Sequence, residues 1–289
     1  MMKALNYALK LLCNRNRDGS FAKQTARERI LTLIANQLEK LGFRNLAIDS
    51  LKPKHVTALV EQWKGEGLAS GTVKNRMAEI RWWSEKVGKQ NVVARSNDYY
   101  GIDRRQFVTN ESKARTLDAS ALEKVRDPYT HLSLRLQAEF GLRREESIKL
   151  RPVQADHGDR LVLQASWTKG GREREIPILT ESQRRVLDDA KVLAGKGSLI
   201  PSELTYIQQL KRFEHQCSKA GIDHVHGHRH AYAQQRYLVL TGRVCPSAGG
   251  KTSKQLSAAE KAADHEARLT ISRELGHERE SVTAIYLGR

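Results

Sequence analysis

The chain has 289 residues, enough for two domains that each bury a hydrophobic core. Its 50 lysine and arginine residues outnumber 33 aspartate and glutamate residues, which gives a net charge of +17. This excess favours nucleic acid as the partner, with a basic protein that has no such partner as the alternative. Three scattered cysteines exclude a disulfide framework or a zinc ribbon, and no apolar run approaches the ~20 residues of a membrane span.

The first apolar stretch, residues 4–12, is broken by polar side chains and lacks a small-residue cleavage site. It therefore predicts a helix rather than a secretory signal. Together with the cysteine pattern, this predicts a cytoplasmic protein.

Residues 1–100 are predicted to form a helical DNA-binding domain. Within 23–41, apolar residues recur at intervals of three and four, as on one face of a helix: Ile30, Leu33, Ile34, Leu38 and Leu41. A second stripe follows Pro53, a residue suited to a first helical turn. A third helix is expected from Ser70, with a buried face made of Val73, Met77, Ile80, Trp83 and Val87.

The opposite face of this third helix is polar and basic, carrying Lys74, Asn75, Arg76 and Arg81. Such a face either follows a DNA backbone or is simply solvated, and the pattern leaves both open. At the paired Trp82 and Trp83, at least one ring is expected in the core. A stacking platform for single strands is the weaker interpretation.

The helical pattern ends in a polar and basic stretch, so residues 101–113 are predicted as a linker and 114–289 as a second domain. Asp118 is positioned to cap a helix through Val125. Alternation over 160–165 and 174–178 predicts two short strands joined as a hairpin, and helices follow residue 181. The expected fold class is mainly α with a small antiparallel sheet. The Ser-, Gly-, Ala- and Lys-rich stretch 247–263 predicts a loop or a loosely held helix.

A phosphodiester-cleaving site needs a nucleophile, a base, an acid for the leaving oxygen and positive charge on the phosphoryl oxygens, and the sequence offers candidates for all four. Tyr286 offers a phenol as nucleophile, with a reference pKa near ~10 that calls for a nearby base or cations. Arg143 and Arg229 are suited to clamp phosphoryl oxygens, because a guanidinium stays charged and donates paired hydrogen bonds. His226 lies about one helical turn before Arg229, so a base and a clamp can share a face.

Two further residues complete this set. Lys169, at the predicted hairpin tip, can deliver a proton to the departing 5′ oxygen, although Arg172 and Arg174 are rival cations in the same hairpin. Arg172 is also a candidate DNA contact. His277 precedes Tyr286 by nine residues, enough for a tight turn and a helix that returns the phenol to the histidine, which would donate a hydrogen bond to the phosphate.

In this order, the residues resemble the tyrosine recombinase family, the phage integrases and their relatives. That family's motifs are an Arg in G-L-R-x-x-E, a hairpin Lys, an H-x-x-R pair, a His or Trp in L-G-H, and a Tyr nine residues later. The matching positions here are Arg143 with Glu146 in support, Lys169, His226, Arg229, His277 and Tyr286. The N-terminal segment resembles the family's helical, SAM-like core-binding domain, so the resemblance covers nearly the whole chain.

The resemblance implies a site-specific integrase of a phage or other mobile element, with a 3′-phosphotyrosyl DNA intermediate and a free 5′ hydroxyl. Because that link conserves bond energy, no metal, ATP or other cofactor is expected. Four protomers, each a monomer free in solution, would exchange strands on two double-stranded DNA sites through a Holliday junction. DNA-bending or directionality proteins are candidate accessory partners, and a membrane partner is not expected.

Two features depart from the family's pattern. The gap from Arg229 to His277 is longer than usual, which predicts an inserted segment between Thr241 and Ala267. The sequence also stops shortly after Tyr286, where many relatives carry a tail that docks on the next protomer, so truncation stays open.

Three other interpretations were weighed. The run His224, His226, His228 and His230 invites a metal site, but neither a cysteine pair nor H-E-x-x-H spacing accompanies it. His230 is instead expected to pack or to hydrogen bond locally. A type IB topoisomerase shares the chemistry, and a non-cleaving DNA-binding protein shares the fold. The helical N-terminal domain favours a recombinase over the first, and the complete catalytic set argues against the second.

Overall fold

The structure is a computed structural model that describes residues 4–168, 171–277 and 279–289. The chain divides into two compact units, the first ending at Gln106 and the second beginning at Phe107. This boundary falls within the segment expected to be a linker. Lys169 lies outside the described residues.

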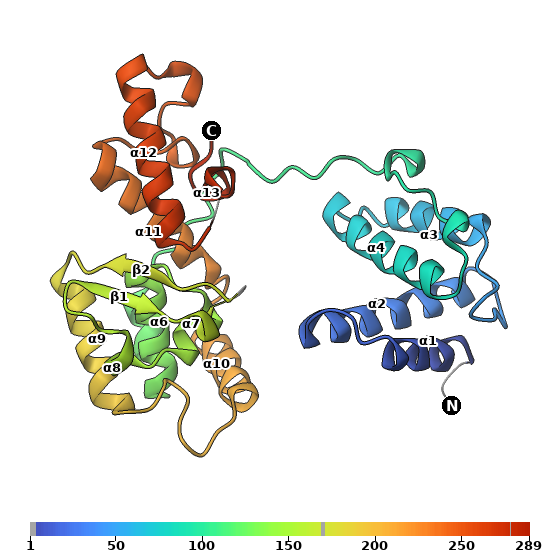
Figure 1. The fold of residues 1–289 in the computed structure, drawn as a ribbon, viewed down its shortest axis with the longest axis horizontal. Helices are drawn as coiled ribbons and strands as arrows, with labels where there is room; N and C mark the ends of the chain where they lie inside the picture. Colours follow the sequence, from blue (N-terminus) through green and yellow to red (C-terminus); the bar gives the residue numbers. More distant parts are fainter. Residues whose placement is uncertain (1–3, 169–170, 278) are drawn as a thin grey trace. The chain divides into compact units, whose positions relative to one another are not determined.

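The first unit is a bundle of four helices with two short 3-10 turns (Figure 1). The elements are α1 (Ala4–Arg15), α2 (Phe21–Lys40), α3 (Pro53–Gly65), α4 (Ser70–Lys86), η1 (Gln90–Val92) and η2 (Asp98–Tyr100). The Ser20 hydroxyl caps α2 by accepting from the Lys23 backbone N–H, and Pro53 is the first residue of α3.

Burial in this unit follows most of the expected stripes. Ile34 and Leu38 are fully buried, whereas Leu33 and Leu41 are 37% and 38% exposed. The predicted stripe was therefore too wide, because only the side of α2 that faces the other helices is covered. Both Trp82 and Trp83 are buried, since Trp83 enters the core and Trp82 stacks under the guanidinium of Arg27 at 4.1 Å.

The second unit packs helices around a two-stranded sheet. Its elements are α5 (Ala119–Glu123), α6 (Pro128–Phe140), α7 (Arg144–Lys149), α8 (Pro152–Ala155), β1 (Arg160–Leu163), η3 (Ala165–Trp167), β2 (Arg174–Pro177), α9 (Glu181–Ala194), α10 (Tyr206–Ala220), α11 (His226–Thr241), η4 (Pro246–Ala248), η5 (Ser253–Gln255), α12 (Ala258–Glu274) and α13 (Glu280–Leu287). Asp118 caps α5 as expected, although that helix ends earlier than predicted.

The strands pair antiparallel, with Leu161 opposite Ile176 and Leu163 opposite Arg174. Leu161, Leu163 and Ile176 are fully buried, so alternate residues of the sheet face the core. Both strands are shorter than expected. The mainly helical class with a small antiparallel sheet is confirmed.

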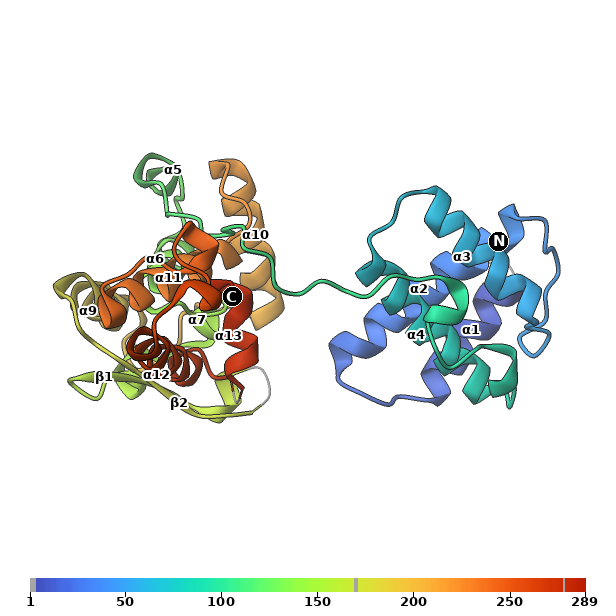
Figure 2. The same cartoon turned by 90° about the horizontal axis from the view of Figure 1, so that it is seen from above.

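The C-terminal helices form one packed group. Figure 2 shows α13 beside α12, and α11 contacts α6, α12 and α13. The stretch 247–263, predicted as a loop or a loosely held helix, contains the end of η4, all of η5 and the start of α12, which begins at Ala258 behind the capping hydroxyl of Ser257. Among the described residues, no helix is long and apolar enough to cross a bilayer.

Candidate active site

The turn between α6 and α7 presents Arg143. α6 ends at Gly141, whose φ is +60°, and a Cβ there would lie 2.6 Å from the Tyr232 ring, so only glycine fits. Leu142 is buried in the core. Arg143 occupies the N-cap of α7, where its backbone N–H donates to Oε2 of Glu146 at 2.7 Å. The turn thus fixes where the Arg143 side chain begins.

Glu146 holds two guanidinium groups. Its Oε1 accepts from Nη1 of Arg143 at 2.7 Å, and Arg174 donates to both carboxylate oxygens at 2.9 and 2.6 Å. Nε of Arg174 donates to the Glu274 carbonyl at 3.0 Å. Burial by itself would raise the pKa of Glu146, but the hydrogen bonds and charge of Arg174, with the charges of Arg143 and Arg229, lower it to about 2. Glu146 is therefore ionised at neutral pH.

Arg229 lies one turn into α11 and is only 1% exposed. Nη1 donates to the Gly141 carbonyl at 2.6 Å, and Nη2 donates to the Leu275 carbonyl. Nε donates to the phenolic oxygen of Tyr286 at 3.2 Å. Burial lowers the pKa of Arg229 to about 10, which still leaves the guanidinium charged at neutral pH. Two backbone carbonyls therefore fix this charge beside the phenol.

Tyr286 lies on α13 and is 5% exposed. Three histidine rings surround it, with centroid distances of 6.0 Å to His226, 4.6 Å to His230 and 5.7 Å to His277. The Arg229 guanidinium carbon is 5.7 Å from the phenol ring centroid. The nucleophile candidate and a clamp candidate are thus in contact within a single chain.

His277 faces the same guanidinium. Its Nε2 is 3.4 Å from Nη2 of Arg229, and because a guanidinium only donates, Nε2 must accept. Burial, followed by the charges of Arg229 and Arg143, lowers the pKa of His277 to about 3, so the ring is neutral at neutral pH. A neutral ring in this tautomer cannot donate from Nε2. An anion placed beside these arginines would favour protonation of the ring.

Two histidines of α11 flank the phenol. Partial burial, followed by the charges of Arg229 and Arg143, lowers the pKa of His226, the first residue of the helix. Burial, followed by the nearby His226 and Lys113, lowers the pKa of His230 to about 4. His226 is therefore available as a neutral base, whereas His230 packs against both His226 and the phenol.

The charges of this cluster do not balance. Among the residues that the structure describes, three guanidinium groups, those of Arg143, Arg174 and Arg229, surround the carboxylate of Glu146, while His277 stays neutral. The cluster therefore carries a net positive charge near the phenol. A phosphodiester is an anion of suitable size and charge to offset it.

Six of the sequence-predicted residues come together: Arg143, Glu146, His226, Arg229, His277 and Tyr286. The predicted role of Lys169 concerns a residue outside the described part of the chain. Arg172 lies in the exposed connection between the strands, where its backbone N–H donates to Thr168 at 2.9 Å.

The four predicted DNA contacts of α4 differ in their surroundings. Arg81 is half-buried and bound to the Ala94 carbonyl and to Asn97, and the guanidinium carbon of Arg76 is 5.2 Å from the Trp63 ring centroid. Asn75 accepts from Arg105, whereas Lys74 is partly exposed. The contacts of Arg81 give it a structural role within its own unit.

Two residues of the site were not assigned roles from the sequence. Arg174 was considered only as a rival to Lys169, although strand alternation would have placed it on the inward face with Ile176. His230 was expected only to pack locally. Among the described residues, no three His, Cys, Asp or Glu side chains gather as metal ligands would.

Family comparisons place this chain among the integrases. The model described as phage integrase, N-terminal, matches residues 2–93, and the model described as integrase matches residues 104–235. The two matches together cover most of the sequence, and the chain belongs to the tyrosine recombinase (phage integrase) family. His277 and Tyr286 lie beyond the matched ranges. Among curated proteins, none has a significantly similar sequence.

Solved structures of tyrosine recombinases share the fold. A Tn1549 transposon integrase bound to circular intermediate DNA aligns over 100% of this chain and 96% of its own, with TM-score 0.55 and 13% identity. XerH recombinase bound to a palindromic difH substrate aligns over 98% and 81%, with TM-score 0.60 and 15% identity. A lambda integrase dimer bound to a COC′ core site aligns over 99% and 95%, with TM-score 0.58 and 15% identity.

Proposed function

We propose that this protein is a site-specific DNA recombinase in which Tyr286 attacks the scissile phosphorus and forms a 3′-phosphotyrosyl link. The contact between Nε of Arg229 and the phenolic oxygen, at 3.2 Å, carries the proposal. It places the nucleophile beside a buried guanidinium whose partners in the described part of the chain include no carboxylate. The phosphorus–oxygen bond to the 5′ side breaks as the new bond forms, so the number of phosphoester bonds is unchanged and no energy source is needed.

Each proposed role follows from the chemistry of the step. Arg143 and Arg229 would neutralise the charge that develops on the pentacoordinate phosphorane. His226 would accept the phenolic proton, since its lowered pKa leaves the ring neutral. Lys169 would protonate the departing 5′ oxygen. His277 would hydrogen bond a phosphoryl oxygen once that anion favours its protonation.

DNA binding would require Arg229 to exchange partners. In this structure, its Nε and one Nη2 hydrogen point to Tyr286 and His277. Phosphoryl oxygens would take both positions, which frees the phenolic oxygen to attack. The two carbonyls of Gly141 and Leu275 would keep the guanidinium in place during this exchange.

The proposed partner is double-stranded DNA bound by both units, with four protomers joined on two sites through a Holliday junction. The lambda integrase tetramer bound to a Holliday junction, which has this fold at TM-score 0.59 and 15% identity, supports that assembly by analogy. Accessory bending or directionality proteins, and a mobile element as the source, belong to the same proposal.

The first test requires a DNA site. Tyr286→Phe protein would select binding sequences from random duplexes, and these would be rebuilt with a nick near the cleavage position so that the released fragment diffuses away. Wild type should then accumulate a detergent-resistant protein–DNA adduct. Tyr286→Phe should bind the same duplex equally and form no adduct.

Two results would contradict the proposal. An adduct that persists in Tyr286→Phe would remove this phenol from the mechanism. Tight, sequence-selective binding by wild type, with no adduct on any nicked site, would instead identify a non-cleaving DNA-binding protein of the same fold.

Salt dependence tests the proposed use of both units. If many Lys and Arg side chains contact phosphates, raising salt from 50 to 200 mM should weaken binding by about 10³-fold or more, because counterions are no longer released favourably. The measurement is a fluorescence titration of the selected duplex. A flat response would contradict an extensive phosphate clamp.

A further inference from the structure

Residues 110–115, here called the anchoring segment, begin a few residues after the boundary between the two units. They belong to the second unit and precede α5, and Figure 1 shows the chain passing α13 as it enters this unit. The segment carries none of the proposed catalytic residues. Its hydrogen bonds nevertheless reach α11, which supplies Arg229, and Arg289, just after the end of the helix that supplies Tyr286.

The first contact is with the chain after the nucleophile. Oδ1 of Asn110 accepts from the Arg289 backbone N–H at 3.0 Å, and Nδ2 donates to the Arg289 carbonyl at 3.1 Å. Gly288, which lies between the end of α13 and Arg289, has a φ of +76°, and a Cβ on it would lie 2.6 Å from Oδ1 of Asn110. One carboxamide thus binds both backbone groups at the exit of α13.

The second contact reaches Tyr286 itself. Oγ of Ser112 donates to Oε1 of Gln234 at 3.1 Å, which leaves the amide nitrogen of Gln234 pointing the other way. That nitrogen donates to the Tyr286 carbonyl at 3.1 Å and to Oγ of Ser247 at 3.1 Å. Ser247 donates to the same carbonyl at 2.9 Å. Because this carbonyl lies in the last turn of α13, it has no partner within the helix and needs external donors.

The third contact is with the first turn of α11. The Arg115 N–H donates to the Gly227 carbonyl at 3.1 Å, and Nδ1 of His228 is 2.9 Å from the Arg115 carbonyl. A Cβ on Gly227 would lie 2.4 Å from Arg115. These contacts fall between His226 and Arg229, so the segment spans from the base and clamp helix to the nucleophile helix.

We propose that the anchoring segment positions the nucleophile, with Ser112 and Gln234 as positioning residues that act through the Tyr286 carbonyl. Ser112 fixes which way the Gln234 amide points, and Gln234 then fixes the last turn of α13, and so the distance from the phenolic oxygen to Arg229. This inference rests on the proposed function.

The test uses full-length protein and the nicked duplex described above. Gln234→Met keeps the length of the side chain but removes both polar groups, and we expect the single-turnover rate of adduct formation to fall by about 10- to 100-fold, because a misplaced nucleophile loses rate steeply. DNA affinity should stay within about twofold. Gln235→Met, one position along the same helix and exposed, is the matched control and should react at the wild-type rate.

A second set of variants separates positioning from general destabilisation. Ser112 is exposed, so Ser112→Ala should fold normally and still slow adduct formation, whereas Ser112→Thr keeps the hydroxyl and should restore the rate. In a double-mutant cycle, Ser112→Ala should add little to Gln234→Met, because both interrupt one relay. Thermal unfolding and DNA affinity are measured for every variant.

Two results would overturn the inference. The first is wild-type adduct formation by folded, DNA-bound Gln234→Met, and the second is a fully additive effect of Ser112→Ala. Failure of the proposed function is distinguishable, because wild type itself would then form no Tyr286-dependent adduct. The comparison among the variants therefore applies only after the wild-type reaction has been seen.

Discussion

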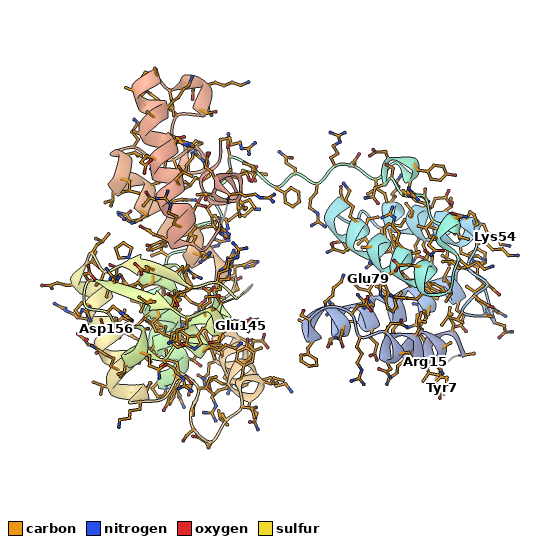
Figure 3. All side chains as sticks on the ribbon, in the orientation of Figure 1. Tyr7, Arg15, Lys54, Glu79, Glu145 and Asp156 are labelled. Carbon is orange, nitrogen blue, oxygen red and sulfur yellow. The ribbon has the colours of Figure 1, made fainter. Side chains whose placement is uncertain are left out.

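Each unit buries a glutamate between two or more cations, Glu79 in the first and Glu146 in the second, but with different charge balances. In the first unit, Glu79 is 2% exposed and pairs with Lys23 and with Nε of Arg27 at 3.1 Å. Figure 3 labels Glu79 on α4. Arg27 also stacks on Trp82, and its Nη1 lies 3.6 Å from Oδ1 of Asp18. The carboxylates of Glu79 and Asp18 therefore offset the positive charges of this cluster.

In the described part of the second unit, Glu146 is the one carboxylate shared by three guanidinium groups, and one of these also contacts a phenol. The first cluster is therefore a structural ion-pair network in which the charges balance. The second is a network in which the described guanidinium groups outnumber the carboxylate, so an added anion would offset the remaining positive charge. A buried glutamate with arginine partners does not by itself mark a site. The proposed site rests instead on the excess of positive charge beside a hydroxyl.

Removing either carboxylate gives the largest expected effect. Glu79→Gln and Glu146→Gln should each lower the free energy of unfolding by about 3–5 kcal/mol, because buried cations lose their counter-charge. Inorganic phosphate should recover part of the loss in Glu146→Gln, since that cluster accepts an anion, but not in Glu79→Gln. Urea unfolding with and without phosphate measures this. Equal recovery in both variants would contradict the distinction.

Replacing Arg229, the proposed phosphate clamp, by another cation tests its proposed part in DNA cleavage. Arg229→Lys keeps a positive charge but loses the fixed pattern of donors, and adduct formation should fall by about 10²–10³-fold. Arg27→Lys, in the other cluster, should leave the rate for folded protein unchanged. The measurement is single-turnover cleavage of the nicked duplex at saturating protein. A similar loss in both variants would indicate a general effect of arginine removal.

The low pKa of Glu146, about 2 against an ordinary value of 4.5, predicts how stability depends on pH. A lowered folded-state pKa contributes stability that is complete above about pH 4.5 and is lost as pH falls toward 2. The loss should be about 3 kcal/mol from this group. Glu146→Gln should remove that part of the pH dependence in urea titrations between pH 2 and 6. An unchanged profile in the variant would contradict the assignment.

The smallest expected effect is direct anion binding. Inorganic phosphate at ten times its Kd should stabilise the second unit by about 1.4 kcal/mol, by mass action. It should also raise the pKa of His277, whose low value comes from burial and then from Arg229 and Arg143. Thermal unfolding measures the gain in stability, and histidine NMR titration measures the pKa of His277. Arg143→Ala should weaken both responses, and equal responses in that variant would exclude this cluster.

The helical fold could be predicted because local pattern and packing agree at most positions. The stripes of α2 and α4, Asp118 at its cap and the strand alternation are all local signals. Exposure at Leu33 and Leu41 could not be predicted, because it depends on which neighbours a helix face meets. Helix ends were similarly uncertain, since caps and tertiary contacts decide the last turn.

The sequence by itself determined which residue types are available for phosphoryl transfer, in what order, and that their helices and hairpin should form. Tertiary structure alone decided that Arg174 rather than a solvated cation pairs with Glu146, that His230 packs on the phenol, and that residues 110–115 bind both α11 and the residue Arg289 that follows α13. The physical reason is the separation along the chain over which each effect acts. Periodicity and caps act over a few residues, whereas burial, pKa and charge balance at the site arise among side chains from α7, β2, α11 and α13, which meet only after the chain has folded.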